Sequence, residues 1–228
     1  MITISDLTVS YGKDKKVINK LKLSLDERHI HGIVGLNGAG KTTLLNALYG
    51  LKKPYSGTIR TDNRTIDKKS ISYLPTENFF FSNITGNEYL NLFVNSEFDT
   101  SRWNSLFGLP LDMIIDGYST GMKKKLALLG VLKQDKNLMI LDEPFNGLDI
   151  ETCCIIRMIL LRLKERNKTI IITSHIIETL TNLCDLIHYL DNGQIKFTRD
   201  KSRFAEFERE VFDKIESDNI TLVNELLK

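Results

Sequence analysis

Long apolar stretches and paired cysteines are scarce in this sequence. No apolar run approaches the ~20 residues that a membrane-spanning helix needs. The N-terminus, Met1-Ile-Thr-Ile-Ser-Asp, lacks the basic start and apolar stretch of a signal peptide. Two of the three cysteines, Cys153 and Cys154, are adjacent, Cys184 is distant, and no Cys-x-x-Cys spacing points to zinc or a disulfide framework. We therefore expect a cytoplasmic protein with reduced cysteines packed as small apolar residues, which reaches a membrane only through a partner.

An excess of charge of one sign is missing as well. The 31 basic and 29 acidic residues leave a formal net charge of +2, which does not indicate a nucleic-acid partner. Hydrophobic residues make up 42% and charged residues 26%, as in ordinary globular proteins. A chain of 228 residues can bury ~70% of the surface that its unfolded form exposes, so disorder is excluded as the main state. The length fits one large domain, or a domain with an inserted subdomain.

Apolar periodicity predicts strands and one helix in the first third of the chain. Residues 2–9 and 17–25 alternate apolar and polar side chains, which is typical of half-buried antiparallel strands. Residues 29–34 lose this alternation and predict a strand buried on both faces. The next predicted elements are a helix over 41–49 and short strands near 57–60 and 70–74.

The middle of the chain has a mostly helical pattern from about residue 84 to 132. Leu90, Phe93 and Val94 are expected on one helix face. A second apolar face would hold Leu126, Leu129 and Leu132. We expect this block to form a subdomain inserted into a β-rich core.

Strands and helices alternate after residue 137. The predicted strands are 138–142 and 169–173, and the predicted helices are 150–166 and 176–183. Residues 186–190 and 194–198 indicate a hairpin around Asn192-Gly193. The whole pattern predicts an α/β fold with a mostly parallel sheet, an antiparallel β subdomain and an inserted α-helical subdomain. Residues 201–228 are charged and amphipathic and predict a helical tail.

A glycine-rich motif begins where the predicted buried strand ends. Gly35-Leu-Asn-Gly-Ala-Gly-Lys-Thr42 fits the P-loop pattern G-x-x-x-x-G-K-[ST] between a strand and a helix. Glycines let backbone N–H groups point at a phosphate chain, and the helix N-terminus adds partial positive charge. Lys41 is expected to reach the β- and γ-phosphates, and the Thr42 hydroxyl to bind Mg²⁺. The candidate phosphate-binding residues are Gly35, Asn37, Gly38, Ala39, Gly40, Lys41, Thr42 and Thr43.

Two carboxylates follow the apolar run Leu138-Met-Ile-Leu. Asp142 and Glu143 would lie at the carboxyl end of a central strand, where open α/β sheets bind ligands. Asp142 is placed to hold Mg²⁺, and Glu143 to polarise the water that attacks the γ-phosphate. An Asp-Glu turn after a strand is common, so this motif is informative only together with the P-loop.

These two motifs leave GTPases, kinases and many ATPases open. The guanine-reading pattern Asn-Lys-x-Asp is missing, since Asn167-Lys-Thr-Ile170 lacks the carboxylate. Ser119-Thr-Gly-Met-Lys123 stands at the start of a predicted helix, 23 residues before Asp142. It resembles the signature motif of ATP-binding cassette (ABC) ATPases. In the order of that family, Asn146-Gly-Leu-Asp149 is similar to the D-loop, and Thr173-Ser-His175 to the switch-histidine segment.

The resemblance covers about residues 1–200 and implies a nucleotide-binding subunit that powers a membrane transporter, with Mg²⁺-ATP as its cofactor. It places Tyr11 against the adenine and His175 at the γ-phosphate. It also implies two copies, identical or different, closed head to tail around two ATP molecules. Ser119, Gly121 and Asp149 would then complete the site of the other copy. The chain would lie on the inner face of the cell membrane through its transmembrane partner, as an exporter-type subunit.

The chain departs from the family pattern at one ligand position. The family's Q-loop carries a glutamine after a strand end, but Tyr73-Leu-Pro75 is followed here by Thr76 and Glu77. Thr76 offers a hydroxyl, so it is a candidate for binding Mg²⁺ through water.

Three consecutive phenylalanines, Phe79 to Phe81, follow at the junction with the helical block. A regular element buries at most about two of three consecutive side chains on one face, so at least one should be exposed. We expect an apolar floor for a helix of the membrane partner; the alternative is that all three pack inside the insert.

Two other functions stay open at this point. A soluble ABC-type ATPase in assembly or repair would need no membrane partner. A P-loop kinase would transfer phosphate to a substrate, although the signature and D-loop segments argue against it.

Overall fold

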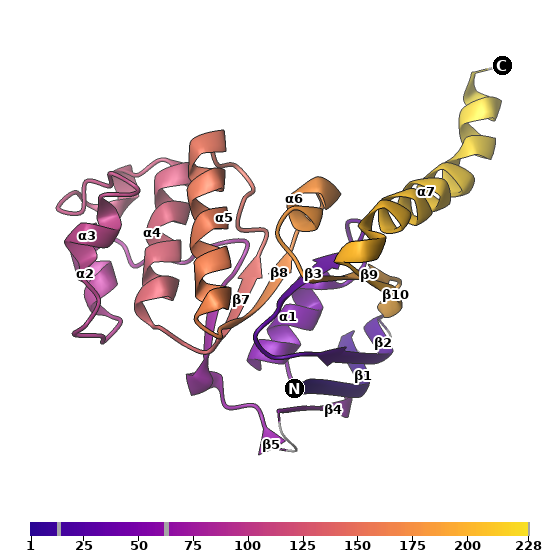
Figure 1. Cartoon of the computed structure of the whole chain (residues 1–228), viewed down its shortest axis with the longest axis horizontal. Helices are drawn as coiled ribbons and strands as arrows, with labels where there is room; N and C mark the ends of the chain where they lie inside the picture. The colour runs from indigo at the N-terminus through magenta and orange to yellow at the C-terminus, as the bar shows by residue number, and fades with distance from the viewer. Residues whose placement is uncertain (13–14, 62–63, 228) are drawn as a thin grey trace.

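Two β-sheets and a group of helices make up the protein, with the helical block at one end and the antiparallel sheet at the other (Figure 1). The structure is a computed structural model and describes residues 1–12, 15–61 and 64–227. No helix within these residues combines the length and apolar character that a bilayer span needs.

A four-stranded antiparallel sheet has the strand order β2-β1-β4-β5. Strands predicted over 2–9, 17–25 and 57–60 are confirmed, whereas the two-residue β5 was not predicted. Alternate residues of β1, such as Ile2 and Ile4, are buried against the core. The strands are β1 (Ile2–Tyr11), β2 (Lys15–Leu25), β4 (Ser56–Thr61) and β5 (Arg64–Thr65).

The central sheet has six strands in the order β10-β9-β3-β8-β7-β6. Its neighbours pair in parallel except β9 and β10, which form the predicted hairpin. Asn192 and Gly193 both have positive φ, 48° and 72°, as the tight hairpin turn requires. The strands are β3 (Ile30–Val34), β6 (Ile71–Leu74), β7 (Leu138–Asp142), β8 (Thr169–Thr173), β9 (Leu186–Asp191) and β10 (Gln194–Asp200).

Helices cover both faces of this sheet and divide the core in two. Every residue of β3, β7 and β8 is buried, so alternate side chains enter opposite cores. One core lies toward α1 and the antiparallel sheet, and the other toward α4, α5, α6 and α7. The helices outside the block are α1 (Lys41–Tyr49), α5 (Ile150–Glu165), α6 (Ile177–Thr181) and α7 (Phe204–Leu226).

The helical block is less helical than the sequence predicts. Its α-helices are α2 (Gly86–Asn91), α3 (Thr100–Asn104) and α4 (Thr120–Lys133), with a short 3-10 helix at Ile115–Gly117. Between them, Asn104 bonds the backbone of Leu109 twice, since its Nδ2 donates to Leu109 O and its Oδ1 accepts from Leu109 N. Such local side-chain bonds favour a turn over a continued helix.

Individual apolar predictions have different outcomes. Leu126, Leu129 and Leu132 are at most 6% exposed, which confirms their shared apolar face. Val94 is 97% exposed because α2 ends before it, so its prediction as a buried helix-face residue is wrong. Cys184 is buried as expected, but Cys154 is exposed and does not pack as a small apolar residue.

The last helix, α7, leaves the body of the protein (Figure 1). Phe204, Phe207 and Val211 bury its first turns against the central sheet. Its final turns are exposed, including Leu226 at 76%.

Candidate functional site

The glycine-rich loop joins β3 to α1 at the carboxyl edge of the central sheet. Gly40 has φ +108°, and a Cβ there would lie 2.9 Å from the Ile18 Cδ1 atom. At Gly35 a Cβ would lie 2.4 Å from the Leu190 carbonyl oxygen. Only glycine satisfies both positions. No side chain caps the first turn of α1, so its backbone N–H groups are free for an anion.

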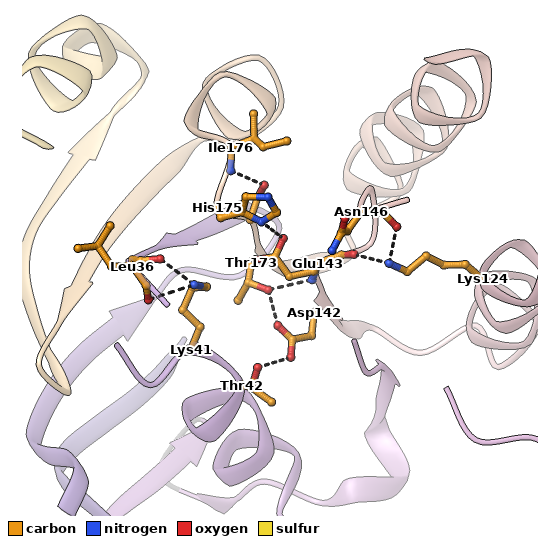
Figure 2. Close-up of polar contacts among 12 residues, drawn as sticks. Leu36, Lys41, Thr42, Lys124, Asp142, Glu143, Asn146, Thr173, His175 and Ile176 are labelled. Carbon is orange, nitrogen blue, oxygen red and sulfur yellow. Dashed lines mark hydrogen bonds and ion pairs between the residues drawn. The ribbon is translucent and has the colours of Figure 1, made fainter. Parts of the chain in front are cut away.

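Lys41 folds back over this loop. Its Nζ donates to the Gly35 carbonyl oxygen at 2.7 Å and lies 3.5 Å from that of Leu36 (Figure 2). Burial lowers the pKa of Lys41 below its ordinary value, and the carboxylates of Glu143 and Asp142 partly oppose that shift. The Lys41 ammonium group can therefore release these carbonyl oxygens and bind phosphate oxygens in their place.

Asp142 is fully buried and is held by two hydroxyl groups. The Thr42 Oγ1 atom donates to one carboxylate oxygen at 2.7 Å, and the Thr173 Oγ1 atom to the other at 2.5 Å. These bonds join α1, β7 and β8 beneath the loop (Figure 2). Both Thr42 and Asp142 therefore present oxygen ligands at one point.

Glu143 has a strained backbone, with φ at +52°. A non-glycine residue in this region costs about 1–2 kcal/mol and is kept where neighbours fix it. Here the Glu143 N–H donates to Thr173 Oγ1 at 3.0 Å, and Glu143 O accepts from Lys124 Nζ at 2.9 Å. The side chain turns to His175, whose Nδ1 lies 3.0 Å from Glu143 Oε2.

Lys124 comes from the helix that begins with the signature-like segment. Its side chain is buried, and its Nζ also donates to the Asn146 carbonyl oxygen at 2.7 Å (Figure 2). Burial lowers the pKa of Lys124, and the nearby carboxylates of Glu143 and Asp142 raise it in part. One ammonium group thus fixes two backbone points of the loop that follows β7.

Several of these groups line a cleft of about 610 Å³, within the size range of ligand pockets. Tyr11 lies at its rim with Lys52 Nζ 4.2 Å from the ring centre, and Thr76 forms part of the wall. Predicted residues that line the cleft are Tyr11, Asn37, Gly38, Gly40, Lys41, Thr42, Thr43, Thr76, Glu143 and His175.

The remaining predicted residues do not line this cleft. Asp142 is buried beneath it, while Gly35 and Ala39 shape the loop from within. Ser119 caps α4 by accepting from Met122 N at 3.2 Å. Asp149 caps α5 by accepting from Thr152 N at 2.8 Å. Gly121 lies near the Asn146–Asp149 loop, since a Cβ there would be 3.8 Å from Gly147 O.

Sequence reasoning missed the roles of Lys124 and Thr173. A signal for Lys124 exists, because it precedes buried Leu128 by four residues and so shares its helix face. Thr173 had no such signal, since its hydroxyl acts on Asp142 and Glu143 from a neighbouring strand.

The residues present fit a magnesium ion. No three His, Cys, Asp or Glu side chains in the described ranges are grouped as a metal site. Mg²⁺ commonly takes only one or two carboxylates and completes its shell with water and phosphate oxygens. The Asp142 carboxylate and Thr42 hydroxyl are that kind of donor set, 2.7 Å apart.

The chain is similar to known proteins over most of its length. A family model described as ABC transporter matches residues 18–146. The ABC transporter ATP-binding protein NatA of Bacillus subtilis strain 168 is 30% identical over 229 residues, which cover 92% of this chain and 93% of NatA.

Two solved structures have the same fold. The ATP-binding subunit of an ABC transporter is 25% identical, with a TM-score of 0.82 over 91% of this chain and 93% of that one. A dimeric ATP-binding cassette in a post-hydrolysis state, bound to ADP and Pi, is 20% identical. Its TM-score is 0.77 over 88% of this chain and 99% of that one.

Proposed function

The chain belongs to the family of ABC transporter ATP-binding proteins, and from that premise we propose that it is an exporter-type subunit that powers a separate membrane protein. It is an ATPase. The observation that supports ATP hydrolysis as the power source is the continuous hydrogen-bonded path from Thr42 through Asp142 and Thr173 to Glu143 and His175 beside an open phosphate loop. That path joins the phosphate-binding loop to a carboxylate suited to activate water.

The phosphate chain of ATP is proposed to lie over the N-terminus of α1. The free N–H groups there and the Lys41 ammonium would bind the β- and γ-phosphates. Thr42 and Asp142 would hold Mg²⁺, with Thr76 contributing through water. When bound, the ion neutralises charge that develops on the phosphate oxygens. Tyr11, whose ring Lys52 already covers on one side, would stack on the adenine.

Glu143 is the proposed general base. Its carboxylate would accept a proton from the attacking water, while the fixed backbone keeps the side chain at the mouth of the cleft. His175 is half-exposed and holds Glu143 Oε2 in this structure. In the ATP-bound state it would turn to the γ-phosphate and so report its presence.

A second copy is proposed to complete each site. Ser119, Gly121 and Asp149 lie at the N-termini of α4 and α5, outside the cleft, where N–H groups can face an anion from another chain. The dimeric form of the fold neighbour bound to ADP and Pi supports such an arrangement. Whether the second cassette is identical or different does not change these contacts.

The phenylalanine segment supports a protein partner rather than a soluble ATPase. Phe79 is 77% and Phe81 56% exposed, and their rings meet edge to face at 5.3 Å. Phe80 instead packs on Tyr89 at 4.9 Å, so the three do not all enter the insert. Exposed aromatic pairs of this kind act as anchors at interfaces. We assign this pair to a helix of the membrane subunit, which would hold the chain at the cytoplasmic face.

The proposed unit spans residues 1–200, with the helical subdomain over about 84–132 inserted into it. Residues 201–228 are proposed as an accessory tail, because only the first turns of α7 are buried in the core.

Copurification with the membrane subunit tests the partner assignment. Phe79→Ala and Phe81→Ala should each weaken docking by ~2 kcal/mol, about 30-fold, with an unchanged melting temperature. Phe212→Ala removes a ring of similar exposure, 60%, from α7 and is the matched control. Docking that survives both substitutions, or is lost only when the protein also unfolds, would remove the two rings from the interface. No copurification of the unmodified chain with a membrane protein would favour the soluble ATPase.

A further inference from the structure

A second cleft, of about 760 Å³, opens at the amino ends of the central strands. Arg28 precedes β3, Asn137 precedes β7, and Arg166 and Asn167 precede β8. The candidate ATP site lies at the carboxyl ends of the same strands, so the two clefts share no residue. This cleft also lies away from the α4 and α5 N-termini, and a head-to-tail dimer through those would leave it open.

Three arginines line this second cleft: Arg28, Arg64 and Arg166. Within the described part of the chain, none of their guanidinium groups has an ion-pair or hydrogen-bond partner. Arg199, by contrast, is paired with Glu210 at 2.7 Å. Three unpaired guanidinium groups around one cleft favour the binding of an anion, because each can bind two phosphate oxygens at once.

Among the residues that the structure describes, the two acidic side chains that line the cleft already have partners. The Glu27 carboxylate is 2.6 Å from the Met1 amino group, and Asp67 accepts from Lys69 N at 3.0 Å. They therefore compete only weakly for the three arginines.

Arg28 occupies a backbone position that favours glycine. Its φ is +62°, and its N–H is fixed by a 2.9 Å bond to Thr169 Oγ1. A residue other than glycine is strained in the left-handed region of backbone conformation. Residues with this strain cluster at functional sites. Arg28 is thus a strained residue that lines the cleft.

Three apolar residues, Ile2, Ile66 and Leu138, are among those that line the cleft, and we call them its apolar floor. Ile2 and Leu138 are almost fully buried and Ile66 is partly buried. Apolar walls with a few charged groups are typical of sites for small organic ligands, and the cleft is larger than one phosphate group. We propose that this cleft binds a small organic diphosphate, whose phosphates contact Arg28, Arg64 and Arg166 and whose organic part lies on the apolar floor.

Calorimetric titration of the full chain tests this site. A saturating, non-hydrolysable Mg²⁺-ATP analogue first blocks the phosphate loop, and inorganic pyrophosphate or isopentenyl diphosphate is then added. We expect saturable one-site binding of both probes, tighter for the organic one. Arg28→Gly should weaken it at least about tenfold, the loss of one charged contact, with an equal or higher melting temperature. Arg64→Gln and Arg166→Gln should have similar effects.

Arg102→Gln, at an exposed arginine on α3, is the matched control and should bind like the wild type. No saturable binding, or wild-type affinity in Arg28→Gly and Arg166→Gln, would overturn the site. Equal affinity for the two probes would contradict the apolar contact.

Discussion

The residues proposed to hold ATP form two groups that differ in how they are bonded within one chain. In the phosphate-loop group, hydrogen bonds join Thr42, Asp142, Thr173, Glu143 and His175, and Lys41 bonds carbonyl oxygens of the loop beside them. The signature group, Ser119 and Asp149 with their neighbours, lies outside that cleft and serves as helix caps. A cap satisfies only one or two of the free N–H groups of a helix start. This difference is what the proposed arrangement requires, in which one group acts within its own chain and the other on a second copy.

The largest effect is expected inside the phosphate-loop group. Glu143→Gln keeps the shape of the side chain but removes the base, so turnover should fall at least ~100-fold while ATP still binds. Steady-state hydrolysis and nucleotide binding measured on the same preparation check this. Turnover within a few-fold of the wild type would remove Glu143 from its role.

The next effect concerns the signature group. Ser119→Arg adds bulk and charge where the other chain's ATP would lie, so hydrolysis should fall at least ~30-fold for a loss of ~2 kcal/mol of contact. ATP binding to the isolated chain should stay within about twofold. Equilibrium dialysis with labelled ATP measures this binding. A loss of ATP binding as large as the loss of hydrolysis would mean that Ser119 belongs to the same cleft as Lys41.

Lys124 links the two groups through two hydrogen bonds. Lys124→Met keeps the length of the side chain but leaves the carbonyls of Glu143 and Asn146 without their donor. We expect turnover to fall about tenfold with little change in KM for ATP, because the base is displaced while the phosphate loop is untouched. Lys124→Arg should restore part of the rate. A stability loss with normal turnover would make Lys124 a packing residue only.

The smallest effect is on stability and comes from a buried pair behind the phosphate loop. His31 Nδ1 lies 3.1 Å from His188 Nε2, and His188 Nδ1 lies 2.8 Å from Thr198 Oγ1. Burial lowers the pKa of both rings, that of His188 to about 3. The unfolded chain therefore binds protons below pH ~6.5 that the native state does not. Stability is complete above that pH and is lost as the pH falls toward 3.

Urea unfolding between pH 7 and 5 measures this loss. Each ring that stays neutral in the native state lowers the free energy of unfolding by up to ~1.4 kcal/mol per pH unit below 6.5. His188→Gln should therefore make the free energy of unfolding depend less on pH. An identical slope in the variant would show that the pair does not control it.

Periodicity predicted the sheets well because the burial of each strand can be read from its own local pattern of apolar residues. β3, β7 and β8 are mostly apolar and do not alternate with polar residues, and no distant residue is needed to recognise them. The helical block was predicted less well because its turns depend on bonds such as that of Asn104 to Leu109. In the candidate site, the motif residues were found from spacing. Thr173 and Lys124 were not, since their partners lie on other elements.

Mixing two inactive variants tests most directly whether each site is shared between chains. Lys41→Ala removes the phosphate-loop group from one chain, and Ser119→Arg removes the signature group from the other. A mixed dimer keeps one intact site, so an equimolar mixture should recover about a quarter of wild-type ATP hydrolysis if the chains pair randomly. Hydrolysis no greater than the sum of the two variants measured separately would contradict a site shared between two copies.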